Sequence, residues 1–380
     1  MLTNVVQFVT LFFLAGSLSA LLTLLTKKLA LRWGIVDQPE GQRKIHRKPI
    51  PLLGGVAVFL AFTLVLLFFL LWDDSYFTGY MLPKHIAGII LGGLILMVGG
   101  VLDDKYNLSP GKLIIWPVLA SLVIITAGIG IDFISNPFGS AFRLDLINIE
   151  VLNWQGVPYY FTPLADIFTL LWLLGMVYTT KLLDGLDGLV SGVTVIGAVV
   201  LFFLSLTPQV MQPETALLCI VLAGAALGFL LLNFHPARIF LGEAGSTWVG
   251  FMLGVLAIIS GGKIATALLI MGIPILDVGW VIARRLWFRQ SPFKSADRKH
   301  LHFRLLDLGF TQRGAVVFFY IVSAIFGSVA LLVEGKYKSL VLALLFIFMF
   351  VLGMILVLKA KRICLPDRQV GGKSATLTKK

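Results

Sequence analysis

Charged side chains and cysteine are both scarce in this sequence, and each shortage excludes a class of protein. Only 13% of the 380 residues are charged, whereas 58% are hydrophobic. This balance is too apolar for an ordinary soluble domain. The two cysteines, Cys219 and Cys364, do not suggest a disulfide framework. The composition is that of a protein with several membrane-spanning segments.

Long apolar runs recur along the chain, each of about the 18 or more residues needed to cross a bilayer. Backbone polar groups in lipid must bond within their own segment, so these runs predict helices. We expect an all-α integral membrane protein with about eleven transmembrane helices. The runs lie at roughly 5–26, 52–72, 84–101, 113–131, 162–178, 188–206, 215–233, 246–262, 264–283, 315–334 and 339–358.

The ends of the chain have different characters. Lys27 and Lys28 follow the first run, where a cleaved signal would have a small-residue cleavage site, so we expect a retained helix. Residues 1–358 then form a single polytopic domain. Residues 359–380 are polar and basic, and we expect a disordered tail.

Lysine and arginine are unevenly distributed between the loops. If the N-terminus lies outside, the outer loops hold few of the 31 Lys and Arg residues: Lys84, Arg143, Lys263, Lys336 and Lys338. The positive-inside rule then predicts an N-out, C-in topology. The net charge of +12 follows one membrane face, so it does not indicate a nucleic-acid partner. Alternating apolar and polar residues within 132–161 predict a short external β-hairpin.

The stretch YTTKLLDGLDGLVS, residues 178–191, places ionisable groups at the junction of two apolar runs. Lys181, Asp184 and Asp187 are three residues apart and share one face if the segment is helical. Charges next to hydrocarbon are costly, and they indicate a functional site by default. Gly185 and Gly188 leave room for a bulky anion to approach the backbone.

Further acids occur in other inner loops. Asp103 and Asp104 are adjacent in GGVLDDKYNLSPGK, where paired acids can bind a divalent cation or act as a base, or can simply form a solvated helix cap. Glu243 lies between glycines in NFHPARIFLGEAGST. This pattern suggests room for a phosphate or a metal, and a glycine-rich helix start is the alternative.

Basic residues and histidines in the same loops suit an anion. In the first inner loop, topology and attraction to anionic lipid explain the same charges equally well. The candidates for substrate binding are Arg43, Lys44, His46, Lys181, Arg238, His300, His302 and Arg304.

All of these groups fall on the predicted inner face. Acids that hold a divalent cation, together with cations for phosphate, describe phosphoryl transfer, and a membrane location implies a lipid substrate. A proton pathway would need acids at mid-membrane depth. The apolar runs are nearly free of acids, and Asp277 is the main exception. A transporter would show broken helices and internal repeats, which the sequence does not indicate.

Five motifs in order resemble those of the polyprenyl-phosphate N-acetylhexosamine-1-phosphate transferase family, and most closely its bacterial undecaprenyl-phosphate GlcNAc-1-phosphate branch. The resemblance covers about residues 27–314. The motifs are DQPEGQRKIHRKPIPLLGG, GVLDDKYNLSPGK, KLLDGLDGLVSG, ARIFLGEAGS and ADRKHLHFRL.

The resemblance implies an activity and a location. Such an enzyme transfers N-acetylhexosamine-1-phosphate, here most simply GlcNAc-1-phosphate, from a UDP-sugar to undecaprenyl phosphate and releases UMP, with Mg²⁺ or Mn²⁺. The implied location is the bacterial inner (plasma) membrane, with the active site facing the cytoplasm. The product would begin a cell-envelope glycan such as lipopolysaccharide or teichoic acid, and a homodimer is a further expectation.

The resemblance also implies roles for the acids. Asp103 and Asp104 would lie near the lipid phosphate, with Asp103 a candidate base. Asp184 and Asp187 would lie by the metal and the nucleotide, and Glu243 and Asp184 would be metal ligands. The two histidines of HLH would contact the diphosphate or the uridine.

The sequence departs from the family pattern at several positions. Lys181 stands where the family has Asn, Glu243 where it has Asp, and Phe303 where it has a second adjacent His; Trp116 stands where Gln is common. We expect Lys181 and Glu243 to form a pair, because the longer acid can reach the added cation. The departures leave open a second interpretation, a catalytically impaired relative that acts as a lipid-phosphate or nucleotide-sugar binding scaffold.

Overall fold

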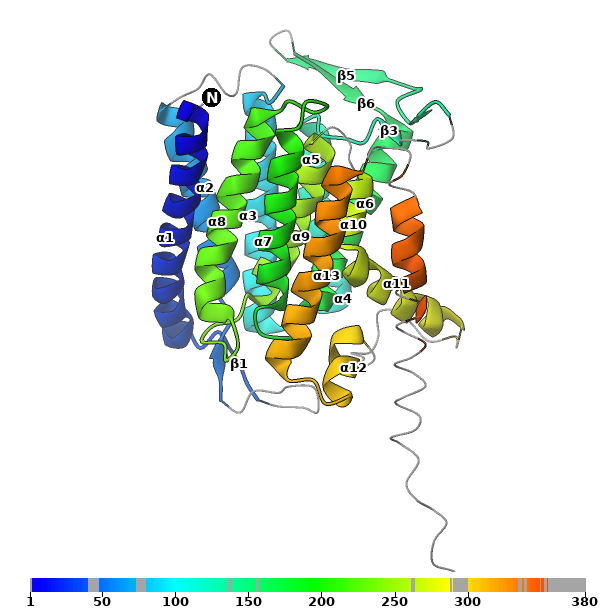
Figure 1. Ribbon diagram of the computed structural model, residues 1–380. Coiled ribbons are helices and arrows are strands. Elements are labelled where there is room, and N and C mark those ends of the chain that lie inside the picture. Colours follow the sequence, from blue (N-terminus) through cyan, green and yellow to red (C-terminus); the bar gives the residue numbers. More distant parts are fainter. Residues whose placement is uncertain are drawn as a thin grey trace, which may run out of the picture.

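The computed structural model is a bundle of helices, with three small two-stranded sheets among the residues that it describes (Figure 1). It describes residues 2–39, 48–72, 80–134, 136, 139–154, 157–260, 264–287, 289, 300–333, 337, 340–348, 350, 351 and 354. The helices are α1 (Leu2–Trp33), α2 (Gly54–Trp72), α3 (Pro83–Tyr106), α4 (Pro110–Leu113), α5 (Ile115–Thr126), α6 (Pro163–Leu183), α7 (Leu189–Ser205), α8 (Pro213–Asn233), α9 (Gly242–Ile259), α10 (Ile264–Ile270), α11 (Gly272–Trp287), α12 (Leu301–Asp307) and α13 (Gln312–Leu332). The strands are β1 (Val36–Asp37), β2 (Ile50–Pro51), β3 (Phe133–Ile134), β4 (Phe142–Arg143), β5 (Ile149–Trp154) and β6 (Val157–Phe161).

The prediction of a helical membrane protein is confirmed in its coarse form. Among the described residues, seven helices are long and apolar enough to span a membrane, namely α1, α2, α3, α6, α8, α9 and α13. Helix α7 and the stretch Pro110–Thr126 are also apolar but shorter. The figure of about eleven spans stays a prediction, and the expected tail at 359–380 lies outside the described residues.

One predicted span is not a single helix. The run 264–283 is divided at Met271 between α10 and α11. Helix α11 then runs obliquely to the other helices (Figure 1). Hydropathy alone could not locate this break, because apolar residues continue on both sides of it.

Helix α9 is the centre of the bundle. Nearly every residue of it is buried, as expected for a helix that is apolar on all sides. It packs against α2, α3, α6 and α7, and small residues allow the closest of these approaches. A Cβ atom built on Gly100 of α3 would lie 2.2 Å from the Cα of Ala244, so only glycine fits there. This close contact therefore fixes the position of the first turn of α9 against the last turns of α3.

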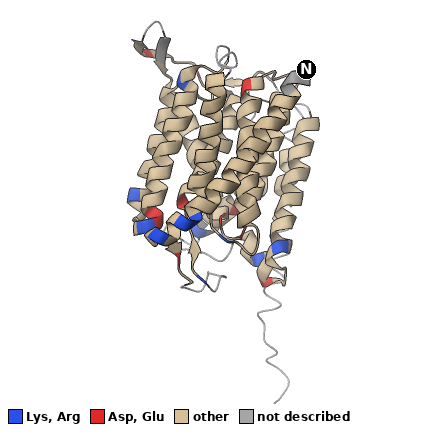
Figure 2. Ribbon diagram, turned by 90° about the vertical axis from the view of Figure 1, so that its left-hand side faces the viewer, with Lys and Arg blue, Asp and Glu red and all other residues tan. Residues whose placement is uncertain are grey.

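The two ends of the bundle differ in charge. In Figure 2, most of the Lys and Arg residues lie at the end away from the N-terminus, and the ribbon between the two ends is mainly uncharged. At the other end, β5 and β6 form the predicted hairpin, which is antiparallel with an irregularity between Glu150 and Leu152 (Figure 1). The charged end is the one at which α3 and α6 finish and α9 begins.

Candidate functional site

Three helix ends bring predicted site residues together. Asp104 lies in the last turn of α3, Lys181 in the last turn of α6 and Glu243 in the first turn of α9. Asp104 Oδ1 accepts a hydrogen bond from the Glu243 backbone N–H at 2.9 Å. Lys181 Nζ donates to Glu243 Oε1 at 2.6 Å, which confirms the expected pair. An acid near the start of α9 also suits the positive end of the helix dipole.

The carboxylates around this pair are not equivalent. Asp103 Oδ1 accepts the Leu108 N–H at 2.8 Å, so Asp103 also closes the end of α3. Asp104 Oδ2 is buried and has no hydrogen-bond partner. Buried polar atoms normally have partners, and one without a partner calls for an explanation such as an ion. Asp104 therefore presents an oxygen that a ligand could satisfy.

Asp184 is the acid most strongly perturbed by its surroundings outside the spanning helices. It follows the last residue of α6 and its backbone N–H donates to Thr180 O. Burial, together with the nearby carboxylates of Glu243 and Asp187, raises its pKa to about 7. Like charges held close together favour either a proton or a cation between them. This arrangement is typical of functional sites.

Asp187, which the sequence predicts as a site residue, bonds to the loop that follows α8. Its Oδ2 lies 2.7 Å from His235 Nδ1 and accepts the Ala237 N–H at 3.0 Å. It thus fixes the loop between α8 and α9, and Arg313 Nε donates to the carbonyl of His235 at 3.0 Å. The sequence pattern did not predict a role for His235, although it lies in the same NFHPAR segment as Arg238.

The turn between α6 and α7 is held from two sides. Asn233 Oδ1 accepts the Gly188 N–H at 3.1 Å and the Ser191 hydroxyl at 2.8 Å. On the other side, a Cβ on Gly185 would lie 2.4 Å from His302 Nε2. Helix α12 therefore packs directly on the acidic turn, and the glycine is needed for this close approach.

The two predicted histidines occupy different environments. His300 Nδ1 lies 2.9 Å from Asp277 Oδ2, and Asp277 Oδ1 accepts the Leu301 N–H at 2.8 Å. Asp277, which the sequence marked only as an isolated acid, thus orients His300 and caps α12. The rings of His300 and His302 are stacked, with centroids 5.6 Å apart.

His302 is fully buried, and neither ring nitrogen has a hydrogen-bond partner. Burial lowers its pKa to about 4, with His300 adding to the effect and Asp277 opposing it. The ring is therefore neutral near pH 7, and its role in binding the substrate stays a prediction. Its neutral ring can still offer one donor and one acceptor. The neighbouring Phe303 is also buried.

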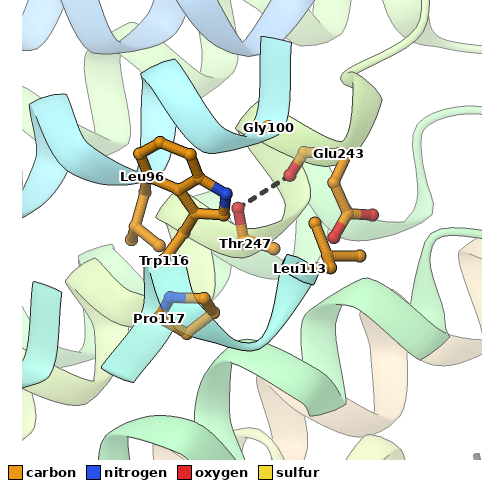
Figure 3. Close-up of a pocket in the computed structure, with 7 residues that line it drawn as sticks. All are labelled: Leu96, Gly100, Leu113, Trp116, Pro117, Glu243 and Thr247. Atoms are coloured by element: carbon orange, nitrogen blue, oxygen red, sulfur yellow. Dashed lines mark hydrogen bonds between the residues drawn. The ribbon is translucent and has the colours of Figure 1, made fainter. Parts of the chain in front are cut away.

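A narrow cavity of about 10 Å³ reaches Glu243 from between α3, α5 and α9 (Figure 3). Thr247 donates from its hydroxyl to the backbone carbonyl of Glu243 at 2.7 Å. Trp116 packs its ring directly against Gly99 and forms one wall. The other walls are mainly apolar, formed by Leu96, Gly100, Leu113 and Pro117. A cavity of this size holds at most a water molecule, so it brings small, mainly apolar walls against the Glu243 carboxylate.

The remaining predicted binding residues belong to other segments of the chain. Arg43, Lys44 and His46 lie outside the described residues. Arg238 is exposed on the loop before α9, and Arg304 is half-buried in α12.

The acids at this end of the bundle are candidate ligands for a divalent cation. In the described part of the chain, no three His, Cys, Asp or Glu side chains are grouped closely enough to hold a metal. The chemistry nevertheless fits, because the donors are carboxylate oxygens, the ligands that Mg²⁺ prefers. Asp104 Oδ2 lacks a partner, and Asp184 experiences repulsion from its neighbours.

The chain is similar to known proteins over most of its length. The model of the family described as Glycosyl transferase family 4 matches residues 86–261, from α3 to α9. A probable undecaprenyl-phosphate N-acetylglucosaminyl 1-phosphate transferase of Bacillus subtilis is 31% identical over 340 residues, which cover 88% of this chain and 86% of that protein.

Two further relatives have the same type of name. A decaprenyl-phosphate N-acetylglucosaminephosphotransferase of Mycolicibacterium smegmatis is 30% identical, over 77% of this chain and 74% of that protein. An undecaprenyl-phosphate alpha-N-acetylglucosaminyl 1-phosphate transferase of Escherichia coli K12 is 28% identical, over 85% of this chain and 84% of that protein. These similarities extend well beyond the acidic motifs and cover most of the helical bundle.

Proposed function

This chain belongs to the polyprenyl-phosphate N-acetylhexosamine-1-phosphate transferase family, and from this premise we infer that it transfers GlcNAc-1-phosphate to a polyprenyl phosphate. It is a multi-pass membrane enzyme. Undecaprenyl phosphate is the acceptor we propose, as in the names of the relatives from Bacillus subtilis and Escherichia coli. The donor follows from the reaction as a UDP-sugar, and UMP is the second product.

The observation that carries this inference is the meeting of Asp104, Lys181 and Glu243 at one end of the bundle, with Asp184 beside them. In the reaction, an oxygen of the lipid phosphate attacks the sugar-linked phosphorus of the donor. The bond from this phosphorus to the bridging oxygen breaks, and UMP leaves with that oxygen. Such transfers depend mainly on positioning and charge neutralisation, and a cluster of fixed charges can supply both.

We assign roles to the chain's own residues. Lys181 offers an ammonium to a phosphate, since an ammonium has three N–H donors and Glu243 uses one of them. Asp103 is a candidate base for the lipid phosphate. The second pKa of a phosphate monoester is about 6, so only a minor part of that phosphate would still need deprotonation near pH 7. His302 offers a neutral ring close to the Asp184 turn.

We propose that Asp184 and Asp104 Oδ2 hold a divalent cation, Mg²⁺ or Mn²⁺, with Glu243 sharing its carboxylate between that cation and Lys181. When bound, such a cation neutralises charge on the phosphates. Asp187 contributes through the loop that it fixes.

We also propose the finer features of the biological setting. The charged end of the bundle faces the cytoplasm of a bacterium, in which UDP-sugars are made, and the protein lies in the inner (plasma) membrane with about eleven spans. The reaction is then the first membrane step of a cell-envelope glycan. The scaffold interpretation is not favoured, since the relatives that cover most of the chain are named as transferases.

The test is UMP release by the purified protein in nanodiscs that contain undecaprenyl phosphate. With UDP-GlcNAc and Mg²⁺, we expect UMP only when the lipid is present, and far less UMP from Asp184→Asn than from the unmodified protein. UDP-GalNAc provides the comparison for the choice of sugar. If no UDP-N-acetylhexosamine releases UMP while nucleotide still binds, the transferase assignment is wrong and the scaffold interpretation replaces it.

A further inference from the structure

The ion pair between Lys181 and Glu243 has unusual surroundings. Lys181 Nζ lies 2.6 Å from Glu243 Oε1, and their side chains are 24% and 13% exposed. The pair joins the end of α6 to the start of α9, so neither group is a flexible surface charge. The Lys181 ammonium also lies 5.8 Å from the centre of the Tyr178 ring, one turn earlier in α6. Its position is thus set from two sides, while part of it stays accessible.

The charges around this pair are mostly negative. Asp104 accepts the backbone N–H of Glu243, and the Glu243 carboxylate acts electrostatically on Asp184. Lys181 is therefore a positive charge inside an acidic cluster. Acids of this kind attract any cation, and an ammonium that already occupies one of them competes with a divalent ion for that carboxylate. The same ammonium attracts the phosphates of a donor.

We propose that Lys181 is a built-in counter-cation of the site, which binds the diphosphate of the nucleotide sugar without a metal and weakens the site's hold on a divalent cation until the donor arrives. In the free protein, Glu243 holds the ammonium. In the donor complex, the diphosphate shares the ammonium, and the Glu243 carboxylate becomes more available to the metal. Lys181 therefore has opposite effects on the two ligands. The inference rests on the proposed function for the identity of the donor.

The experiment measures the two ligands separately on full-length protein in nanodiscs without lipid acceptor. Binding of UDP-GlcNAc is measured in EDTA, and binding of Mn²⁺ without nucleotide is measured by electron paramagnetic resonance. For Lys181→Asn we expect about tenfold weaker UDP-GlcNAc binding and about tenfold tighter Mn²⁺ binding. Damage to the fold would weaken both, so the opposite signs distinguish this role from a purely structural one.

Matched variants complete the test. Lys181→Arg retains the charge and should stay within about threefold of the unmodified protein for both ligands. Lys112→Asn removes an exposed lysine from α4, at the same end of the bundle, and should change neither affinity. If Lys181→Asn does not fold, Glu243→Gln provides the second test. It releases the ammonium, so UDP-GlcNAc binding in EDTA should tighten while Mn²⁺ binding weakens.

The proposal is overturned if Lys181→Asn leaves both affinities unchanged, or if the unmodified protein does not bind UDP-GlcNAc in EDTA. Weaker donor binding by Glu243→Gln would also contradict it. Failure of the proposed function gives a different pattern. Without UMP release but with UDP-GlcNAc binding that depends on Lys181, the transferase assignment fails and this inference stands. With UMP release but no effect of Lys181 on either ligand, only this inference fails.

Discussion

Two ion pairs of the same length lie at opposite ends of this protein. Lys181 and Glu243 are 2.6 Å apart at the charged end, and Arg143 and Asp145 are also 2.6 Å apart near the hairpin. Their surroundings differ, since the Arg143 side chain is 69% exposed and its partner is only two residues away. The Arg143 guanidinium lowers the pKa of Asp145, as expected for a local pair in water.

The difference teaches that the length of an ion pair does not report its function. An exposed pair is screened by water and contributes little. The pair at the charged end joins two helices and lies among further carboxylates, so a change in one partner alters the charge that all of them experience. Both ends carry one pair of a basic and an acidic side chain. The same kind of substitution can therefore be made at each end and the effects compared.

The largest effect is expected from Asp184→Asn. Loss of this charge should reduce UMP release about 100-fold or more, because the site loses a carboxylate that would hold the cation. Removing a like charge beside Glu243 and Asp187 should leave the melting temperature unchanged or raise it. Asp145→Asn is the matched control and should retain activity within about twofold. Equal loss in the two variants would remove the distinction between the two ends.

A double-mutant cycle should give the next largest effect. Lys181→Met, Glu243→Gln and the double variant are compared by denaturant unfolding in a mild detergent. We expect a coupling free energy of about 1 kcal/mol, since the partly buried side chains are screened less than surface charges. The corresponding cycle with Arg143→Met and Asp145→Asn should show no measurable coupling. Additive effects at Lys181 and Glu243 would show that the pair contributes nothing beyond its members.

A smaller effect should appear with pH. The pKa of His302 is about 4 in the folded protein and 6.5 is its ordinary value, so the unfolded chain binds more protons between these values. The stability from neutral His302 is thus fully present above about pH 6.5 and is lost as the pH falls toward 4. The melting temperature of the unmodified protein relative to His302→Gln should fall over this range. Parallel curves for the two proteins would contradict the lowered pKa.

The smallest effect is expected from Arg143→Ala. The side chain is exposed and lies in β4, which pairs with β3 at the end away from the acidic cluster (Figure 1), so UMP release should stay within about twofold and the melting temperature should hardly change. A large loss of activity would show that the hairpin end takes part in the reaction. It would thereby break the comparison between the two ends.

Much of the fold could be predicted from the sequence because lipid imposes simple rules on it. Apolar length located the spanning helices, and alternation located the hairpin between β5 and β6. Local periodicity did not predict the division of 264–283, where α11 turns away from the bundle. That turn depends on packing with distant helices, which no local pattern records.

In the site, too, residue types could be predicted from the sequence, whereas contacts between distant segments could not. Residue type and the departures at Lys181 and Glu243 predicted a pair that the structure confirms, because one added cation calls for one longer acid. The contact between Asp187 and His235 joins residues 48 positions apart, so no local pattern could predict it. Likewise, Asp277 could be marked as an isolated acid, but its bond to His300 depends on how α11 and α12 meet.

The contact of Gly100 with Ala244 has a consequence for how this protein can change over evolutionary time. An added methyl group on Gly100 would displace the turn that carries Glu243, and no neighbouring residue can become smaller to compensate, because the clash is with the backbone. The charged groups, in contrast, can be exchanged in matched steps, as a lysine and a longer acid together. The close contact between the two helix backbones is thus harder to replace than the charged side chains. Over evolution, substitutions are expected to change the charged groups of the site before they change the packing of α3 against α9.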